Sequence, residues 1–221
     1  MKITVLAATG GIGRHLLRQA VAAGHDVTVV VRNPDRLSER VRTVVADLST
    51  ATPAALRPAV EGADAVVSGL GARSGKEAGV AWRGTRAVAT AMSGAGVRRI
   101  VVVSAAPIGT VALPGRPRPP KHDPGDGFFM RHLGAPLTRV FLREHYADLA
   151  LMEEALREGD LDWTIVRPPR LTDRPPTGTY RTAYGRNVRG GTLVSRADVA
   201  HCMLRALEQP ETVRRTLGVA D

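Results

Sequence analysis

The chain has 221 residues, a formal net charge of +10 and a sequence isoelectric point near 11.0. That length fits one domain, or one domain with a substantial insertion, and it can bury a core without cross-links. The single cysteine, Cys202, excludes an intramolecular disulfide framework. No apolar run reaches the roughly 18 residues that a membrane span needs. We therefore expect a cytoplasmic protein without a signal peptide and without membrane contact.

The positive charge is mostly arginine that is scattered along the chain rather than gathered in a tail. Aromatic residues make up only 4% of the chain, which leaves little material for stacking on bases. The charge therefore does not predict specific nucleic-acid binding, and it is better suited to attracting a small anionic cofactor or substrate. The sequence does not separate a monomer from a homodimer.

Apolar strands and helices alternate along the first half of the chain. Near-continuous valine and isoleucine runs joined by helices are typical of a parallel sheet covered on both faces. In chain order we expect strands over 2–7, 26–32, 41–46, 63–68 and 99–104, and helices over 11–23, 53–60 and 78–94. Because crossovers are right-handed, this order predicts an α/β doubly wound parallel sheet, the Rossmann fold.

The alternation breaks at Pro107. Residues 107–143 are rich in proline, glycine and arginine, and proline removes amide donors and fixes φ. We expect an irregular insertion over the active-site edge, because it follows a central strand. Phe128, in an apolar cluster of this insertion, is a candidate substrate contact; the alternative is that the cluster contacts another subunit. Helices are expected again at 144–157 and 198–208, and strands at 163–167, 179–183 and 192–195, all within one domain of residues 1–221.

A glycine-rich turn joins the first strand to the first helix, with the sequence Ala8-Thr9-Gly10-Gly11-Ile12-Gly13-Arg14. It matches the dinucleotide pattern G-x-G-x-x-G, with Ala8 in place of the first glycine. Gly10 lets the backbone approach a pyrophosphate, Gly13 lets the helix pack on the strand, and the helix N-terminus offers N–H groups. We therefore expect this segment to bind a nucleotide cofactor rather than to form a plain tight turn.

The second strand ends in Arg32 rather than in an acidic residue. An acid there would accept hydrogen bonds from the ribose of NAD, whereas a guanidinium can bind a 2′-phosphate with two N–H bonds. Arg36, one helical turn later, and Arg14 are candidates to join it. The sequence thus favours NADP(H) as the cofactor. The alternative is that these arginines are simply solvated.

Several further motifs resemble those of one superfamily. In order after the glycine turn come Val31-Arg32-Asn33, Ala46-Asp47-Leu48, Gly84-Thr85-Arg86 and Val103-Ser104-Ala105. This order resembles the atypical short-chain dehydrogenase/reductase superfamily. Three later motifs make the chain most similar to its NAD(P)H-binding flavin reductase and biliverdin-IXβ reductase type: Arg167-Pro168-Pro169, Pro176-Thr177-Gly178-Thr179-Tyr180 and Ser195-Arg196-Ala197-Asp198-Val199. The resemblance covers residues 1–106 and 144–219.

This resemblance implies roles for particular residues. The glycine turn would bind the pyrophosphate, Asp47 and Leu48 would flank the adenine, and Ser104 would face the nicotinamide. The cofactor crevice would also be lined by Gly69, Leu70, Gly71 and Pro168. Two of these roles have structural alternatives: Asp47 could cap a turn or helix, and the Ser104 hydroxyl could bond to nearby backbone.

The chain departs from the superfamily's usual catalytic pattern. Ordinary short-chain dehydrogenases carry Tyr-x-x-x-Lys, but here Tyr146 is followed four residues later by Ala150, and no lysine occurs after Lys121. A tyrosine with an unperturbed pKa near 10 is a poor proton relay at neutral pH. Alcohol–ketone chemistry by that pair is therefore not expected.

Other candidates for chemistry are few. Ser104, His145 and Tyr146 are the candidate catalytic residues; His145 could donate a proton, or could simply open its helix at the surface. Arg170 suits an anionic small-molecule substrate. No other ligand stands at metal spacing from His122-Asp123, so no metal site is expected.

We therefore expect a cytoplasmic NADPH-dependent reductase that transfers hydride to a flat conjugated acceptor, such as a flavin, a bilin or a quinone. Two alternatives stay open. One is a non-catalytic NADP(H)-binding sensor that signals through a partner. The other is a sugar-nucleotide epimerase-like enzyme, which the missing Tyr-x-x-x-Lys pair disfavours.

Overall fold

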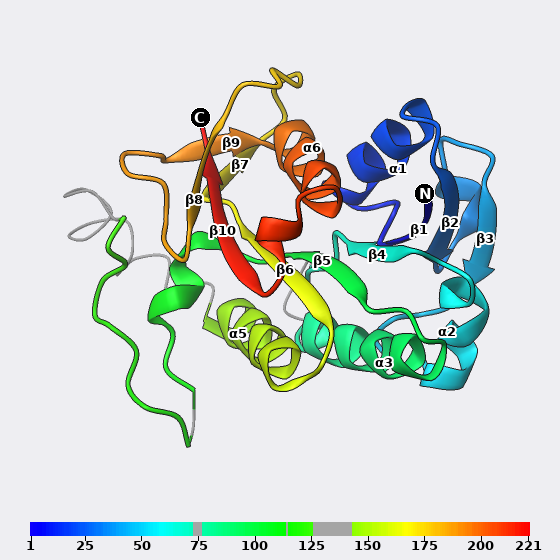
Figure 1. The fold of residues 1–221 in the computed structure, drawn as a ribbon, viewed down its shortest axis with the longest axis horizontal. Helices are drawn as coiled ribbons and strands as arrows, with labels where there is room; N and C mark the ends of the chain where they lie inside the picture. Colours follow the sequence, from blue (N-terminus) through cyan, green and yellow to red (C-terminus); the bar gives the residue numbers. More distant parts are fainter. Residues whose placement is uncertain (73–76, 114, 126–142) are drawn as a thin grey trace.

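The computed structural model describes residues 1–72, 77–113, 115–125 and 143–221. Its main sheet has eight strands: β1 (Lys2–Leu6), β2 (Asp26–Val31), β3 (Arg42–Val45), β4 (Ala65–Ser68), β5 (Arg99–Val103), β6 (Asp162–Arg167), β8 (Arg181–Tyr184) and β10 (Arg215–Ala220). Their order is β3-β2-β1-β4-β5-β6-β10-β8 (Figure 1). Neighbours run parallel except β10 and β8. The predicted doubly wound Rossmann fold is confirmed, with its change of winding direction between β1 and β4.

Helices cover both faces of the sheet (Figure 1). One face carries α1 (Gly13–Ala22) and α6 (Arg196–Leu207), and the other carries α2 (Pro53–Val60), α3 (Val80–Gly94) and α5 (Arg143–Glu158). The central strands are buried on both sides, so alternate residues of one strand belong to different cores. On β5, Val101 and Val103 pack in the core of α1 and α6, whereas Ile100 and Val102 pack in the other.

The N-terminus of α3 is capped by a side chain from another helix. Gly79 precedes α3 with φ at 83°, a left-handed conformation that favours glycine, and it has no side chain to act as a cap. The carboxylate of the buried Asp148 on α5 accepts hydrogen bonds from the amides of Ala81 (3.0 Å) and Trp82 (2.8 Å) instead. This contact fixes α5 against α3.

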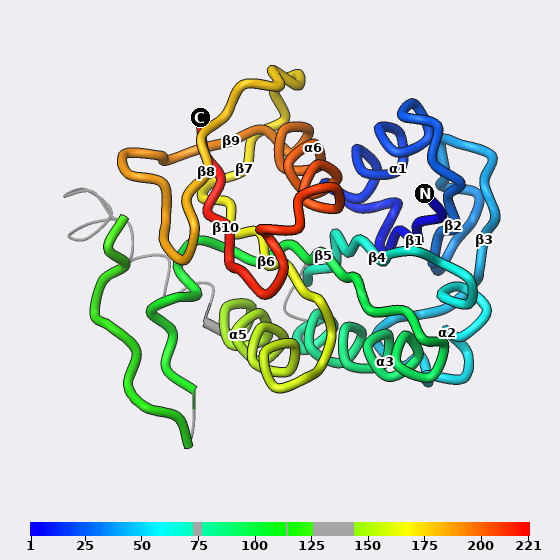
Figure 2. The backbone as a smooth tube through the Cα atoms, in the orientation of Figure 1, coloured from blue at the N-terminus to red at the C-terminus, as the bar shows by residue number. Residues whose placement is uncertain are grey.

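A second, two-stranded parallel sheet is formed by β7 (Arg170–Thr172) and β9 (Leu193–Ser195). Figure 2 follows the chain as it leaves β6, forms β7, β8 and β9, and enters α6. Ser195 caps α6, since its hydroxyl accepts from the Asp198 amide at 2.9 Å. The Ser195–Asp198 pair thus has the character of a capping box, and α6 begins two residues before the predicted helix.

Some predicted elements need correction. The strands β7 and β10 were not predicted, and β8 makes the sheet edge antiparallel. Residues 106–110 form a 3₁₀ turn, and the described residues from 111 to 125 contain no helix or strand, as the proline content predicts. Phe128 lies outside the described residues.

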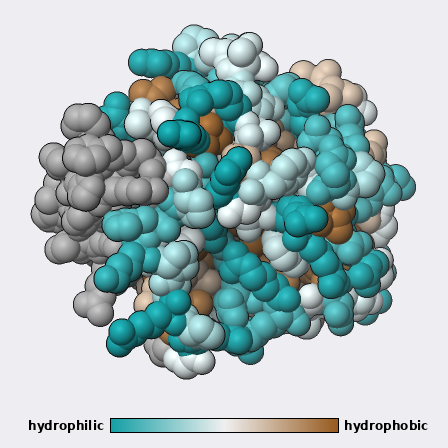
Figure 3. All heavy atoms as spheres, turned by 60° about the vertical axis from the view of Figure 1, so that its left-hand side comes forward, coloured by the Kyte–Doolittle hydropathy of each residue, from teal (hydrophilic) through white to brown (hydrophobic). Residues whose placement is uncertain are grey.

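Hydrophilic side chains predominate on the face shown in Figure 3, and hydrophobic ones emerge there only in small separate spots. Large exposed hydrophobic residues among those described are Met1, Val45, Leu151 and Tyr184. Within the same part of the chain, helices fall short of the length and apolar character needed to cross a membrane.

Candidate functional site

The turn after β1 depends on close contact between backbone atoms. A Cβ atom on Gly13 would overlap the carbonyl oxygen of Ala7, so only glycine lets α1 begin this near the strand. Ala7 itself has φ at 57°, and its carbonyl accepts from the Gly10 amide at 2.8 Å. The assignment of Ala8 to the glycine position was wrong, because it is Ala7 that adopts the left-handed backbone that glycine favours.

A cleft of about 680 Å³ opens beside this turn, along the carboxyl ends of the central strands. Its size falls in the range of cofactor sites, roughly 300–1,000 Å³. The predicted site residues that line it are Thr9, Gly10, Gly11, Ile12, Arg32, Asp47, Leu48, Gly69, Leu70, Gly71, Ser104 and His145. The fold therefore brings together residues from six separate segments of the sequence at the edge where open α/β sheets bind ligands.

Of the predicted site residues that the structure describes, six do not line this cleft: Gly13, Arg14, Arg36, Tyr146, Pro168 and Arg170. Arg14 is exposed and pairs with Asp173 at 3.7 Å. Tyr146 is buried in the core between the sheet and α5. The buried Pro168 accepts a hydrogen bond from the Ala106 amide, whereas Arg36 and Arg170 are exposed.

At the carboxyl end of β2, Arg32 extends into the cleft with 52% of its side chain exposed. Its guanidinium donates to Glu77 at 2.9 Å and lies 4.0 Å from Asp47. Arg83 lines the same end and donates to the Ala78 carbonyl at 2.8 Å. This end of the cleft therefore holds two guanidinium groups in reach of water, beside two carboxylates.

Asp47 lines the cleft, and it also fixes a turn, which is the structural alternative that the sequence left open for this residue. Its Oδ1 accepts from the amide (2.9 Å) and the hydroxyl (2.7 Å) of Ser49. These hydrogen bonds, with the charge of Arg32, lower the pKa of Asp47. The carboxylate is thus ionised at neutral pH, and contact with an adenine stays a prediction.

Next to these charges the cleft wall is apolar. Leu48, Leu70 and Val80 are buried and line it. Gly84 on α3 permits this arrangement, because a Cβ atom there would lie 2.7 Å from Leu70 Cδ2 and 3.0 Å from the Leu48 carbonyl oxygen. A flat apolar wall beside charged groups suits a ligand with a planar ring joined to phosphates.

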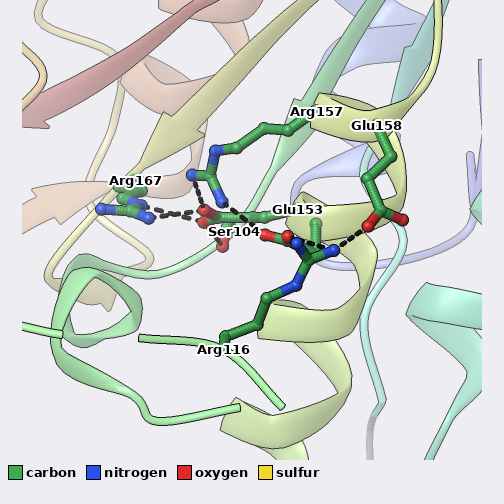
Figure 4. A network of polar contacts seen from close by, with 7 residues as sticks. Ser104, Arg116, Glu153, Arg157, Glu158 and Arg167 are labelled. Carbon is green, nitrogen blue, oxygen red and sulfur yellow. Dashed lines mark hydrogen bonds and ion pairs between the residues drawn. The ribbon is translucent and has the colours of Figure 1, made fainter. Parts of the chain in front are cut away.

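At the other end, Ser104 follows β5 and belongs to a buried polar network (Figure 4). Its hydroxyl donates to Glu153 Oε1 at 2.6 Å. The hydroxyl therefore bonds to a distant side chain and not to nearby backbone, which was the structural alternative for this residue. Arg167 donates to both oxygens of Glu153, at 2.8 and 2.5 Å, and Arg157 adds a bond at 2.5 Å. Burial raises the pKa of Glu153, but these two arginines and Ser104 more than offset it and hold the pKa below its usual value.

His145 lies between these two ends. It lines the cleft from the first turn of α5, and its Nδ1 is buried without a hydrogen-bond partner among the described residues. Burial lowers the pKa of His145, against a smaller opposing effect of Asp148. The ring is therefore neutral at physiological pH and offers a nitrogen atom to a ligand in the cleft.

The sequence did not single out Arg83, Arg196 or Leu171, which also line the cleft. Arg196 lies in the motif Ser195-Arg196-Ala197-Asp198-Val199, which supported the family resemblance but was given no role in binding. Its position over the glycine turn depends on packing between α1 and α6, which no local pattern signals. Arg83 could have been noticed, because it precedes the Gly84-Thr85-Arg86 motif on one helix.

The described residues contain no cluster of three or more histidine, cysteine or acidic side chains that could hold a metal ion. Asp123 is buried and accepts hydrogen bonds from the amides of Gly125 and Asn187, both at 2.8 Å, so its carboxylate fixes a turn. Cys202 is buried in the α6 core, and burial raises the pKa of its thiol to about 12. It is therefore a core residue whose thiol stays protonated at neutral pH.

The strand order, the glycine turn and the cleft together define a Rossmann-type dinucleotide-binding protein. The NAD(P)H-binding family model matches residues 7–210, and the chain belongs to this family. The predicted resemblance to atypical short-chain dehydrogenases/reductases is confirmed at this level.

Similar proteins cover nearly the whole chain. The UPF0659 protein C216.03 of Schizosaccharomyces pombe is 30% identical over 99% of this chain and 90% of its own length. The uncharacterized sugar epimerase YhfK of Bacillus subtilis is 26% identical over 100% and 94%. The crystal structure of the oxidoreductase ylbE from Lactococcus lactis superposes with a TM-score of 0.80, covering 100% of this chain and 91% of that one, at 20% identity. At that identity the last comparison supports the fold alone.

Proposed function

We propose that this protein is an NADPH-dependent reductase that transfers hydride to a flat conjugated acceptor, such as a flavin, a bilin or a quinone. The observation that carries the choice of NADPH is Arg32, an accessible guanidinium at the end of β2 in the cleft of an NAD(P)H-binding fold. An acidic residue at this position would favour NAD instead. The chemistry of hydride transfer belongs to the nicotinamide ring of the cofactor.

The described residues fit such a dinucleotide. Gly13 lets α1 begin close to β1, because a Cβ atom there would overlap the Ala7 carbonyl oxygen, and the N-terminus of α1 thereby reaches the cleft. Leu48 and Leu70 supply an apolar wall of the right character for an adenine, and Arg32 with Arg83 supplies positive charge for a 2′-phosphate.

At the β5 end of the cleft, the residues of this chain would position the nicotinamide and shield it from water rather than exchange protons with the substrate. The Ser104 hydroxyl is committed as a donor to Glu153, so its lone pairs can accept a hydrogen bond from a bound carboxamide. His145 is neutral, and Tyr146 is buried away from the cleft. These features favour an acceptor that needs no strong protein acid, because a flat conjugated ring can take its proton from solvent.

The test of the cofactor is a comparison of two charge reversals, Arg32→Glu and Arg36→Glu. Both variants change the net charge equally and lie only four residues apart in the sequence, but only Arg32 lines the cleft. We expect Arg32→Glu to weaken NADPH binding about 30-fold and to leave NADH binding within about twofold, because a charged hydrogen bond to phosphate is lost. Arg36→Glu should weaken NADPH binding by less than about threefold through its field alone. Equal losses of NADPH and NADH affinity would contradict the choice of NADPH.

The test of turnover is stopped-flow mixing of the NADPH-loaded protein with flavins, bilins and quinones. The proposal expects oxidation of NADPH faster than the background rate with at least one of them. A sensor would bind NADPH with the same dependence on Arg32 but would show no oxidation above background.

The name of the B. subtilis relative favours a second candidate, a sugar-nucleotide epimerase. That chemistry would keep the cofactor tightly bound and regenerate it within each turnover. The missing Tyr-x-x-x-Lys pair weighs against it, since α5 carries Ala150 where the lysine would stand. Conversion of UDP-sugars by the NAD(P)⁺-loaded protein without net change in absorbance near 340 nm (about the NAD(P)H band) would favour this candidate over the reductase.

A further inference from the structure

The glycine turn faces a side chain that comes from the opposite end of the sequence. Arg196, the first residue of α6, lines the cleft, and its side chain is 28% exposed. Its Nε and Cδ lie 2.9 and 3.0 Å from the point where a Cβ atom on Gly11 would stand. The guanidinium therefore lies directly against the segment that binds phosphate in this fold, and Gly11 leaves the space for it.

The backbone of Arg196 is firmly held. Ser195 and Asp198 on either side are buried, and they bond to each other in both directions, at 2.9 and 2.7 Å. On the α1 side, the Gln19 side chain donates to the Ala197 carbonyl at 2.9 Å. The position of Arg196 over the turn is thus preorganised by the packing of α6 against α1, which reduces the cost of ordering a ligand contact.

The partner of Arg196 is an exposed carboxylate. Asp173, with 71% of its side chain exposed, pairs with Arg196 at 3.0 Å and with Arg14 at 3.7 Å. An ion pair that is open to water contributes little, so a phosphate oxygen can replace this carboxylate at small cost. Arginine also matches the geometry of phosphate oxygens with its paired N–H groups.

A nearby histidine reports the sign of the local field. Burial lowers the pKa of His15 on α1, and the charges of Arg18, Arg14 and Arg196 lower it further against the single opposing charge of Asp173. The surroundings of the glycine turn are therefore positive overall, as an anion site requires.

We propose that Arg196 is a second diphosphate-binding group, which binds the dinucleotide diphosphate from the α6 side of the glycine turn and exchanges Asp173 for a phosphate oxygen. This inference rests on the proposed function, because it needs a dinucleotide in the cleft. It assigns different phosphates to two arginines: the 2′-phosphate to Arg32 and the diphosphate to Arg196.

The experiment uses two fragments of the cofactor as probes, with binding measured by calorimetry on the full chain. ADP carries the diphosphate without the 2′-phosphate, and adenosine 2′-monophosphate carries the reverse. We expect Arg196→Met to weaken ADP about tenfold and to leave adenosine 2′-monophosphate within about twofold, the size of one charged hydrogen bond. Arg32→Met should show the opposite pattern. Arg18→Met, which removes the same charge from the outer side of α1, is the control for the field and should change ADP binding by less than about threefold.

A second variant tests the exchange without touching the arginine. Asp173→Asn should strengthen ADP binding about threefold, because the competing carboxylate is neutralised while the exposed site keeps its fold. Unchanged ADP affinity in Arg196→Met, or equal losses in Arg196→Met and Arg18→Met, would overturn the inference and leave the proposed function standing. Failure of the unaltered protein to bind either fragment would overturn the proposed function, and this inference with it.

Discussion

Two arginines, one that lines the β2 end of the cleft and one in the buried network behind its β5 end, are held in opposite ways. At the β2 end, Arg32 pairs with Glu77 at 2.9 Å while 52% of its side chain stays exposed. At the β5 end, Arg167 pairs with Glu153 at 2.5 Å, and the two side chains are 8% and 0% exposed. An exposed pair can exchange its carboxylate for another anion, whereas a buried pair cannot lose one charge without leaving the other unsatisfied. The first end is suited to a charged ligand, and the second to fixing Ser104.

Glu153→Gln gives the largest expected effect at the buried end. We expect it to lower the free energy of unfolding by about 3 kcal/mol, because Arg167 is left without its buried counter-ion. Urea denaturation followed by circular dichroism measures this. Glu158→Gln, on the same helix and paired with Arg116 at the surface, is the control and should cost less than about 1 kcal/mol. Similar losses in both variants would contradict the distinction between the two ends.

The fold could largely be predicted because its central strands, such as β2 and β5, are rich in valine and isoleucine. The strand β10 was not predicted, because Gly218 interrupts its run of apolar residues. That glycine is needed where the Arg186 carbonyl approaches the strand closely. The cofactor end of the site could be predicted because the glycine turn and Arg32 stand next to strand ends in the sequence. The buried network could not, since Ser104 and Glu153 meet only through the packing of α5 on β5 and β6.

The glycine turn lies between the two ends, and Ala7→Gly is expected to stabilise the protein by about 1 kcal/mol. Ala7 has φ at 57°, and an L side chain is strained in this conformation. The matched control is Ala8→Gly, which should destabilise by about 0.5–1 kcal/mol because Ala8 is buried without a left-handed backbone and glycine only adds flexibility. Thermal and urea unfolding check the two signs. Loss of stability in both variants would mean that Ala7 carries no strain.

At the exposed end, Glu77→Gln is the counterpart of Glu153→Gln. We expect it to raise NADPH affinity about threefold, because Arg32 no longer shares its charge with the nearer of its two carboxylates, and to change the free energy of unfolding by less than about 1 kcal/mol. Fluorescence titration with NADPH measures the first effect. Glu61→Gln, which removes an equal charge from the exposed pair with Arg57 on α2, should leave NADPH affinity unchanged. A weaker affinity for NADPH in Glu77→Gln would show that Glu77 assists the cofactor rather than competes with it.

The smallest expected effect concerns His145, which lies between the two ends, and it appears in the dependence of stability on pH. Burial lowers the pKa of His145 below its ordinary value of 6.5, so below about pH 6.5 the unfolded chain takes up a proton more readily than the folded one. The stability linked to this ring is therefore fully present above the unfolded pKa and is lost as the pH falls through the folded pKa. We expect His145→Gln to reduce the loss of unfolding free energy between about pH 7.5 and about pH 5.5.

The matched control for this effect is His15→Gln, because burial also lowers the pKa of His15, but this ring lies on α1 and does not line the cleft. Without a ligand, both variants should flatten the pH dependence of stability. Only His145→Gln should also change the effect that bound NADPH has on this pH dependence. The reason is that a ligand in the cleft would contact or further bury the His145 ring alone. If NADPH changed the pH dependence of the two variants equally, His145 would be a core residue of α5, and the interpretation of its open Nδ1 as a ligand contact would fail.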